Sequence, residues 1–342
     1  MHLLIYIYFF LFSETCCTDL LSKACQTLSF GEVIDEVSFL QKLVEELKEK
    51  EAQSAFSVQN IKSDEQFKAI TGFNREKFYC LFNFLNMEDN LQKKVKLSEE
   101  EQFFLFLIKL RTGITNEFLS ILFKISDSTV SRYFNNTVNV VYNKLLLLDI
   151  WPSRSLIQAN MPSQIRVENR QCRVIIDCTE FRIQKPNNPV EQQLTFSHYK
   201  NDNTLKAMIG ITPSGAISFI SDLYCGSTSD KELFLLSGLL SKLEPGDMVM
   251  ADKGFLIEKE LRSKNCTLKT PTFLKDRIQF PVLERECNNM LSNNRVHVER
   301  AIGRIKYFKY FEGDLPYMAL HNANEVFFIA SMLVNFGCPL IE

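Results

Sequence analysis

The chain has 342 residues, of which 46% are hydrophobic and 23% charged, and its formal net charge at pH 7 is −2. This composition excludes a disordered chain and predicts two or three globular domains. The slightly negative charge argues against a protein that coats nucleic acid nonspecifically, because bulk phosphate binding needs an excess of Lys and Arg. A local basic face is compatible with it.

The ten cysteines include no CxxC pair and no Cys/His grouping at zinc-finger spacing. They predict reduced, mostly buried thiols of an intracellular protein. Residues 1–30 form an apolar start and linker, in which Leu3–Phe12 is too short to span a bilayer. A signal peptide is the competing interpretation of this run, although basic residues before it and a clear cleavage pattern after it are missing.

We expect a helical region over residues 31–96. At its start, Val37, Leu40, Val44 and Leu47 recur at spacings of three and four and predict an amphipathic helix over 31–54. An ordinary packing helix is favoured there over a dimerising coiled coil, because the heptad pattern is short. Two core-forming helices, separated by Gly72, are expected between residues 64 and 85.

Residues 97–150 predict three closely spaced helices. Ser98 is expected to cap the first, which ends at Gly113, and Thr115 to cap the second. The second and third helices have the apolar spacing of a helix-turn-helix, carried by Leu119, Leu122, Ile125, Val130 and Phe134.

Ser128, Thr129 and Arg132 are then exposed on the third helix, where they would contact base edges or phosphates. A helix pair that never touches DNA is the alternative, since Lys124 and Arg132 supply little positive charge.

After Trp151-Pro152 and a polar linker, the pattern changes to strands over 173–183, 193–201, 204–213, 216–225 and 247–255. Helices are expected over 230–243, 256–265, 293–311 and 324–336, with a short strand near 268–273. This order predicts an α/β domain over 168–338, a mixed sheet flanked by helices, preceded by an all-helical N-terminal region.

Three acidic residues carry the chemistry. Asp177 and Asp252 end the apolar runs VIID and VMAD, and Glu299 lies on a charged helix. Enzymes that cut phosphodiesters commonly hold two divalent ions about 4 Å apart, and rigidly placed carboxylates are suitable ligands. Taken singly, each acid is as readily a turn residue or a surface salt-bridge partner. The combination predicts a metal site.

At about 100° per residue, Val298, Ala301, Ile302 and Ile305 form the buried stripe of the Glu299 helix. Arg295, Glu299 and Lys306 share an adjoining face with Gly303, and residues 293–311 hold five Lys or Arg against one acid. We therefore expect Glu299 to bind the ion, and Arg295 and Lys306 to meet phosphate oxygens.

Residues close in sequence to the three acids, and Asp230, also have expected roles. Glu180 is a candidate to support the ligands from behind, and Asp230 is favoured as a helix cap over a metal contact. His297 is assigned to packing or solvent. Lys253 and Gly254 suit a tight turn near a phosphate.

The segments RVIIDCTEFRIQKP, GITPSGAISFISDLYCGSTSDKEL, DMVMADKGF and NNRVHVERAIGRIKYF follow in order within residues 95–335. Together with the preceding helix-turn-helix they resemble the transposase-derived DDE superfamily endonucleases of the PIF/Harbinger type. The resemblance implies an RNase H-like core, a metal-binding triad of Asp177, Asp252 and Glu299, Mg²⁺ or Mn²⁺ as the ion, and cleavage and joining of DNA strands in the nucleus.

The chain departs from the family's pattern in two places. Ser292 stands where related insertion-sequence enzymes carry a Tyr, and no zinc-coordinating THAP pattern precedes the core. DNA would then be recognised by the helix-turn-helix or by a separate Myb-like partner protein. A homo-oligomer is a further expected partner, and no membrane is expected.

The alternative function is a domesticated DNA-binding or protein-interaction protein without catalysis. The three intact acids favour the enzyme, because a chain that no longer cuts has no physical need to gather mutually repelling carboxylates.

Overall fold

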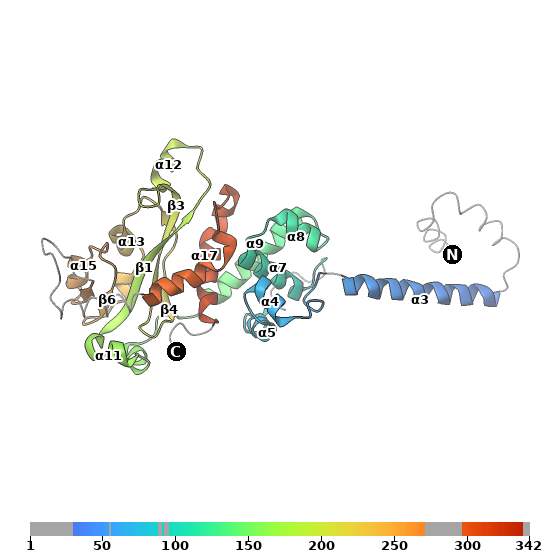
Figure 1. Ribbon diagram of the computed structural model, residues 1–342, viewed down its shortest axis with the longest axis horizontal. Helices are drawn as coiled ribbons and strands as arrows, with labels where there is room; N and C mark the ends of the chain where they lie inside the picture. The colour runs from blue at the N-terminus through green and yellow to red at the C-terminus, as the bar shows by residue number, and fades with distance from the viewer. Residues whose placement is uncertain (1–29, 55, 88–90, 92–95, 271–295, 338–342) are drawn as a thin grey trace. The chain divides into compact units, whose positions relative to one another are not determined.

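The computed structural model describes residues 30–54, 56–87, 91, 96–270 and 296–337 (Figure 1). The chain divides into two compact units, residues 1–56 and 57–342. In the first, the predicted amphipathic helix is confirmed as α3, Phe30–Ser54. The apolar run Leu3–Phe12 lies outside the described residues. Across the described ranges, no helix has both the length and the apolar character needed to cross a membrane.

The second unit begins with helices whose first residues are capped by side chains of the local sequence. They are α4 (Asp64–Thr71), α5 (Arg75–Phe84), α7 (Glu99–Thr112), α8 (Asn116–Leu122) and α9 (Asp127–Leu146). As predicted, Ser98 forms a capping box with Glu101, and Gly113 ends α7 in the left-handed region at φ 67°. Buried Phe rings fill the space between these helices, for example Phe67 and Phe104 with centroids 5.5 Å apart. The all-helical N-terminal region is thus confirmed.

The sheet has five principal strands: β1 (Cys172–Arg182), β3 (Asp202–Ile211), β4 (Ile217–Ile220), β6 (Met248–Met250) and β7 (Thr267–Lys269). β1 lies between antiparallel β3 and parallel β6; β4 pairs with β3, and β7 with β6. The short strands β2 (Phe196–Ser197) and β5 (Tyr224–Cys225) also pair with β3. This is the mixed sheet flanked by helices that was predicted, and it has the RNase H-like arrangement.

Helices cover both faces of this sheet, as Figure 1 shows. Val174, Ile176 and Met208 share a buried core with residues of α13 (Asp230–Leu236), α14 (Leu239–Lys242) and α15 (Glu258–Ser263). On the other face, α17 (Ala323–Asn335) packs against β4 on one side and α9 on the other. This helix therefore joins the sheet to the helical region.

Several predicted elements differ in the structure. The strand expected over 193–201 is instead α12 (Pro189–Thr195) followed by two-residue β2, because Asn188 caps a helix that has Pro189 in its first turn. The polar linker contains α10 (Arg154–Ala159) and α11 (Ser163–Asn169). The run 216–225 is divided between β4 and β5.

The helix expected over 293–311 is shorter. In the described part it spans residues 296–306, and a 3-10 turn, η1 (Lys309–Phe311), follows. Residues 293–295 lie outside the described residues. The helix expected over 230–243 is interrupted by Gly238, which adopts a φ of 78° between α13 and α14.

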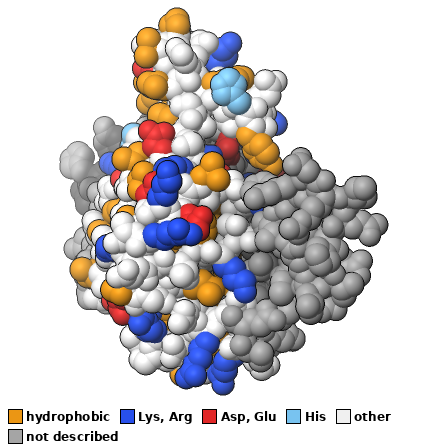
Figure 2. Space-filling model, turned by 90° about the vertical axis from the view of Figure 1, so that its left-hand side faces the viewer, with side chains coloured by type: hydrophobic (Ala, Val, Ile, Leu, Met, Phe, Trp, Pro, Cys, Tyr) orange, Lys and Arg blue, Asp and Glu red, His pale blue; other side chains and the backbone are white. Residues whose placement is uncertain are grey.

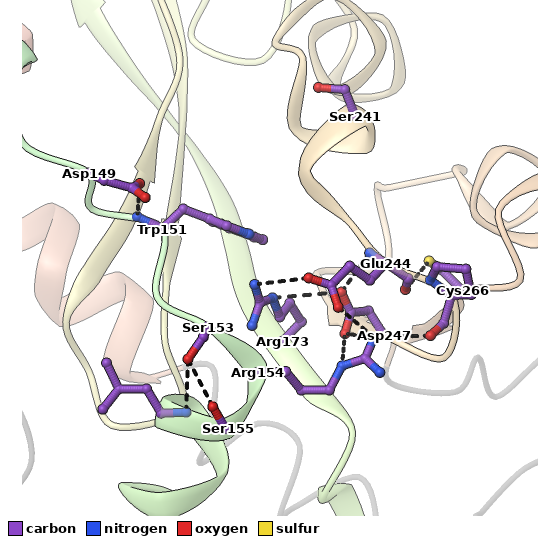
Figure 3. Close-up of polar contacts among 12 residues, drawn as sticks. Asp149, Trp151, Ser153, Arg154, Ser155, Arg173, Ser241, Glu244, Asp247 and Cys266 are labelled. Atoms are coloured by element: carbon purple, nitrogen blue, oxygen red, sulfur yellow. Dashed lines mark hydrogen bonds and ion pairs between the residues drawn. The ribbon is translucent and has the colours of Figure 1, made fainter.

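A buried ion pair joins the start of β1 to the start of β6 (Figure 3). Arg173 Nε lies 3.6 Å from Asp247 Oδ2, and the two side chains are 2% and 1% exposed. Arg154 also contacts Asp247, with its Nη2 2.9 Å from Oδ1, and Trp151 lies 4.9 Å from the Arg173 guanidinium. These contacts join the starts of the two strands that lead to the predicted aspartates.

Candidate functional site

The pairing of β1 with β6 brings the chain segments of the two predicted aspartates to the same end of the strand pair. Ile175 is the register partner of Met250 in this parallel pair. Two residues after this register pair come Asp177 and Asp252, so both acids lie toward the same end of the paired strands. β6 ends at Met250, and Asp252 therefore sits in the loop just beyond the strand. Both residues are half-buried.

Each of the two aspartates accepts a hydrogen bond from the backbone amide of the residue that follows it. Asp177 Oδ1 accepts a hydrogen bond of 2.8 Å from the backbone amide of Cys178, and Asp252 Oδ1 accepts one of 2.7 Å from that of Lys253. A carboxylate bonded to its own following amide loses rotamer freedom and has its direction set by the strand. Each acid is thus oriented by the backbone that carries it.

The helix over residues 296–306 presents its predicted faces. Val298, Ala301, Ile302 and Ile305 are buried, which confirms the predicted stripe, and Glu299 is exposed. Arg295 lies outside the described residues. Glu299 precedes Lys306 by seven residues, or about −20° around the helix, so the two side chains share one face.

Lys306 connects this face to β1. Its Nζ lies 5.7 Å from the centre of the Phe181 ring. Phe181 follows Asp177 by four residues on β1. Burial lowers the pKa of Lys306 below its ordinary value and the charge of Lys200 lowers it further, while Glu180 and Asp177 act in the opposite direction. The helix that carries Glu299 therefore ends close to the strand that carries Asp177.

Among the residues that the structure describes, no three His, Cys, Asp or Glu side chains form a group able to hold a metal ion. The three predicted carboxylates thus lie on neighbouring elements without a closed ligand group in this part of the chain. Their roles stay a prediction.

Comparison with family models decides the class of this domain. Residues 176–335 match the model described as DDE superfamily endonuclease, and residues 95–146 match the helix-turn-helix of DDE superfamily endonuclease. The chain carries a DDE superfamily endonuclease domain. No curated protein and no solved structure matches the chain.

An ion-pair network not predicted from the sequence supports the endonuclease domain behind the two aspartates. Lys206 Nζ lies 2.6 Å from Asp230 Oδ1 and 3.9 Å from Glu180 Oε1. Thr204 donates a 2.9 Å hydrogen bond to Glu180. The side chains of Lys206 and Glu180 are 12% and 7% exposed, so these charges are mostly removed from water.

The network reaches the Asp252 loop. A Cβ added to Gly254 would lie 3.1 Å from Asp230 Oδ2, a very close approach, so the loop packs directly on this carboxylate. Asp230 is therefore not the cap that was expected. Ser229 caps α13 by accepting from the amide of Glu232, and Asp230 follows it as the first helical residue, paired with Lys206. Glu180 pairs with Lys206 and Thr204, and its expected role in supporting the metal ligands stays a prediction.

Electrostatics keep this network charged. Burial acts to lower the pKa of Lys206, but the hydrogen bond and charge of Asp230 outweigh burial and raise the pKa above its ordinary value. Burial, and next the charge of Asp230, raises the pKa of the neighbouring Cys178 thiol. Cys178 is therefore a protonated, unreactive thiol. The sequence signal for the network is Lys206 itself, a charge within the apolar run of β3 and the register partner of Glu180.

The helix-turn-helix matched by residues 95–146 is formed by α8 and α9. Leu119, Ile125, Val130 and Phe134 are buried, whereas Leu122 is half-buried.

Of the three side chains expected to meet DNA from α9, Ser128 and Arg132 are exposed and Thr129 is half-buried. The hydroxyls of Ser128 and Thr129 lie 3.1 and 2.8 Å from that of Ser126, the N-cap of α9. Arg132 therefore offers the longest reach toward a phosphate.

Proposed function

We propose that this protein is a divalent-metal-dependent DNA endonuclease of transposase type. The observation that carries the proposal is that two neighbouring, parallel strands lead to Asp177 and Asp252 in a part of the chain that matches the DDE superfamily endonuclease model. Two carboxylates brought together there would repel each other, and a shared cation is the usual reason for such an arrangement.

Asp177, Asp252 and Glu299 would hold the ions. Carboxylate oxygens are the ligands that the hard cations Mg²⁺ and Mn²⁺ prefer, so the donor set fits. Bound in such sites, divalent ions activate water and stabilise the leaving oxygen of a phosphodiester. The chain's own residues orient the carboxylates: Asp177 and Asp252 by hydrogen bonds to the following amides, and Glu299 by the buried stripe of its helix.

DNA would be held on both sides of the bond that is cut. Lys306, set against Phe181, offers a positive charge to a phosphate beside the acids, and Arg295 is proposed for the same role. Ser128, Thr129 and Arg132 of α9 would contact the duplex farther away. The match of residues 95–146 to the helix-turn-helix of such endonucleases supports this assignment.

The finer assignment rests on the motifs. We propose the PIF/Harbinger type, action in the nucleus, and recognition of the target with a Myb-like partner or as a homo-oligomer. Whether strands are joined after they are cut belongs to the same proposal.

The test compares the purified protein with three isosteric variants, Asp177→Asn, Asp252→Asn and Glu299→Gln. Supercoiled plasmid is incubated with Mg²⁺ or Mn²⁺ and its nicking followed on gels. We expect cleavage by the parent protein and its loss in all three variants, because an amide is a much weaker ligand than a carboxylate. Glu258→Gln is the control, since this exposed carboxylate pairs with Arg262 on the surface of α15.

A second measurement separates the enzyme from a non-catalytic protein that keeps the fold. Mg²⁺ should raise the Tm of the parent protein, since a ligand that binds only the folded state stabilises it by about 2.7 kcal/mol at 100 times its Kd. The rise should disappear in Asp177→Asn. DNA binding without cleavage and without a metal-dependent rise in Tm would instead support the domesticated, non-catalytic alternative.

A further inference from the structure

A groove of about 560 Å³ runs along the flank of the helix that carries Glu299. Its walls come from the end of α4, from the helix over residues 296–306 and from the end of α17. The residues that matter here are Lys68, Phe73, Arg300, Gly303, Arg304 and Phe308. The groove thus lies between the helical region and the endonuclease domain within the unit 57–342.

All charged side chains that the structure places along this groove are basic: Lys68, Arg300 and Arg304. This is informative in a chain whose net charge is −2. Arg300 and Arg304 are four residues apart on one helix, an arrangement of like charges that destabilises an isolated helix. On the face shown in Figure 2, by contrast, Lys and Arg side chains form separate groups, some of them beside acidic ones.

The groove has a preformed wall. The Arg111 guanidinium lies 3.3 Å from the centre of the Tyr307 ring, and Arg111 also donates a hydrogen bond to the Tyr307 carbonyl. Phe73 and Phe308 are 4% and 5% exposed, with ring centroids 6.3 Å apart. Packing therefore fixes the position of the helix before any ligand binds, which lowers the entropic cost of binding.

Packing against neighbouring atoms does not explain why residue 303, in this groove, is a glycine. A Cβ added there would meet no atom within 4 Å, although Gly within a helix is less stable than Ala. Gly303 also follows Glu299 by four residues, which places it one turn along the same side of the helix. The missing side chain leaves a flat surface beside the predicted metal ligand, where a ligand can approach the helix closely.

We propose that this groove binds the phosphate backbone of the DNA substrate next to Glu299, an inference that rests on the proposed function. Three cations on a preformed wall complement a polyanion, and the groove adjoins the acid predicted to act on that polyanion. The contact is with the backbone and carries no sequence preference.

The test measures DNA binding without cleavage. Fluorescence anisotropy in EDTA gives the Kd of the protein for a duplex between 50 and 200 mM salt. Each phosphate contact contributes about 0.9 to the slope of log K against log salt, so the variant Lys68→Met/Arg300→Met/Arg304→Met should lose about 2.7 of that slope. The control Lys242→Met/Lys264→Met changes lysines of the α14 and α15 surface and should keep the parent slope.

Gly303→Ala is the decisive single change. It should raise the Tm, because Ala favours the helix and meets no neighbour, and yet weaken duplex binding by partly filling the groove.

A raised Tm with an unchanged Kd, or a triple variant with the parent's salt slope, overturns the inference. If no cleavage is found but the slope still depends on the three cations, the proposed function fails and the groove inference stands.

Discussion

At the scale of single residues, the structure shows how this domain tolerates mostly buried charge. Lys206 is paired with Asp230 and Glu180, and Asp230 in turn touches Gly254 in the loop that carries Asp252. A buried cation between two acids is compensated only as a set, because removing one member leaves the others desolvated without a partner. The position of the Asp252 loop therefore depends on a lysine that is not itself a candidate ligand.

We predict that Lys206→Met lowers the free energy of unfolding by about 3–5 kcal/mol near neutral pH. The raised pKa of Lys206 means that the folded state holds this proton more tightly than the unfolded state. Its contribution is thus fully present below the ordinary lysine pKa of 10.5 and is lost as the pH rises through the higher folded value. Urea unfolding from pH 6 to 9 should show a constant difference between parent and variant.

The matched control for this prediction is Lys231→Met. Lys231 follows Asp230 on α13 and lies 2.7 Å from Glu260, but its side chain is 42% exposed. An exposed pair of this kind contributes about 0–1 kcal/mol. Equal losses in the two variants would contradict a special role for the Lys206 network.

At the scale of elements, local signals explain both the successes and the errors of prediction. The caps Ser98, Thr115 and Gly113 lie where the sequence predicts them, because capping depends on residues within one turn. The segment 193–201 was wrongly predicted as a strand, since its alternating pattern hid the helix signal of Asn188 and Pro189. α10 and α11 have six and seven residues, too few for hydrophobic periodicity to show.

The Arg173–Asp247 ion pair joins the start of β1 to the start of β6, the two strands that lead to Asp177 and Asp252. We predict that Asp247→Ala lowers the free energy of unfolding by about 3–5 kcal/mol, because it leaves Arg173, 2% exposed, without its buried partner. Glu244→Ala is the control: Glu244 reaches the same arginine at 4.0 Å from a side chain that is 57% exposed, and should cost less than about 1 kcal/mol. Thermal and urea unfolding measure both.

At the scale of the whole molecule, the unit 57–342 holds the helix-turn-helix and the endonuclease domain together. α17 packs on both α9 and β4, and Asn322 donates a 2.9 Å hydrogen bond to Asn135 of α9. The domain limits predicted from the sequence, 97–150 and 168–338, separate parts that share this interface. These domain limits stay a prediction.

We therefore predict that a protein comprising residues 57–342 folds independently. Its Tm should lie within a few degrees of that of the full chain, and its unfolding should be a single transition seen alike by circular dichroism and by tryptophan fluorescence. The single Trp, Trp151, lies between the helical region and β1 in the sequence and reports on the sheet through Arg173. Two separate transitions, or an insoluble fragment, would contradict this prediction.

By itself, the sequence determined the strand of Asp177, the buried stripe of the Glu299 helix and the capped helices of the helix-turn-helix, because each depends on residues close together in the chain. Only the tertiary structure decided that the strands leading to Asp177 and Asp252 are parallel neighbours, that Lys206 joins Glu180 to Asp230, and that three cations line one groove. These relations join strands and helices many residues apart, and their register is set by the packing of the whole sheet, which no local pattern encodes.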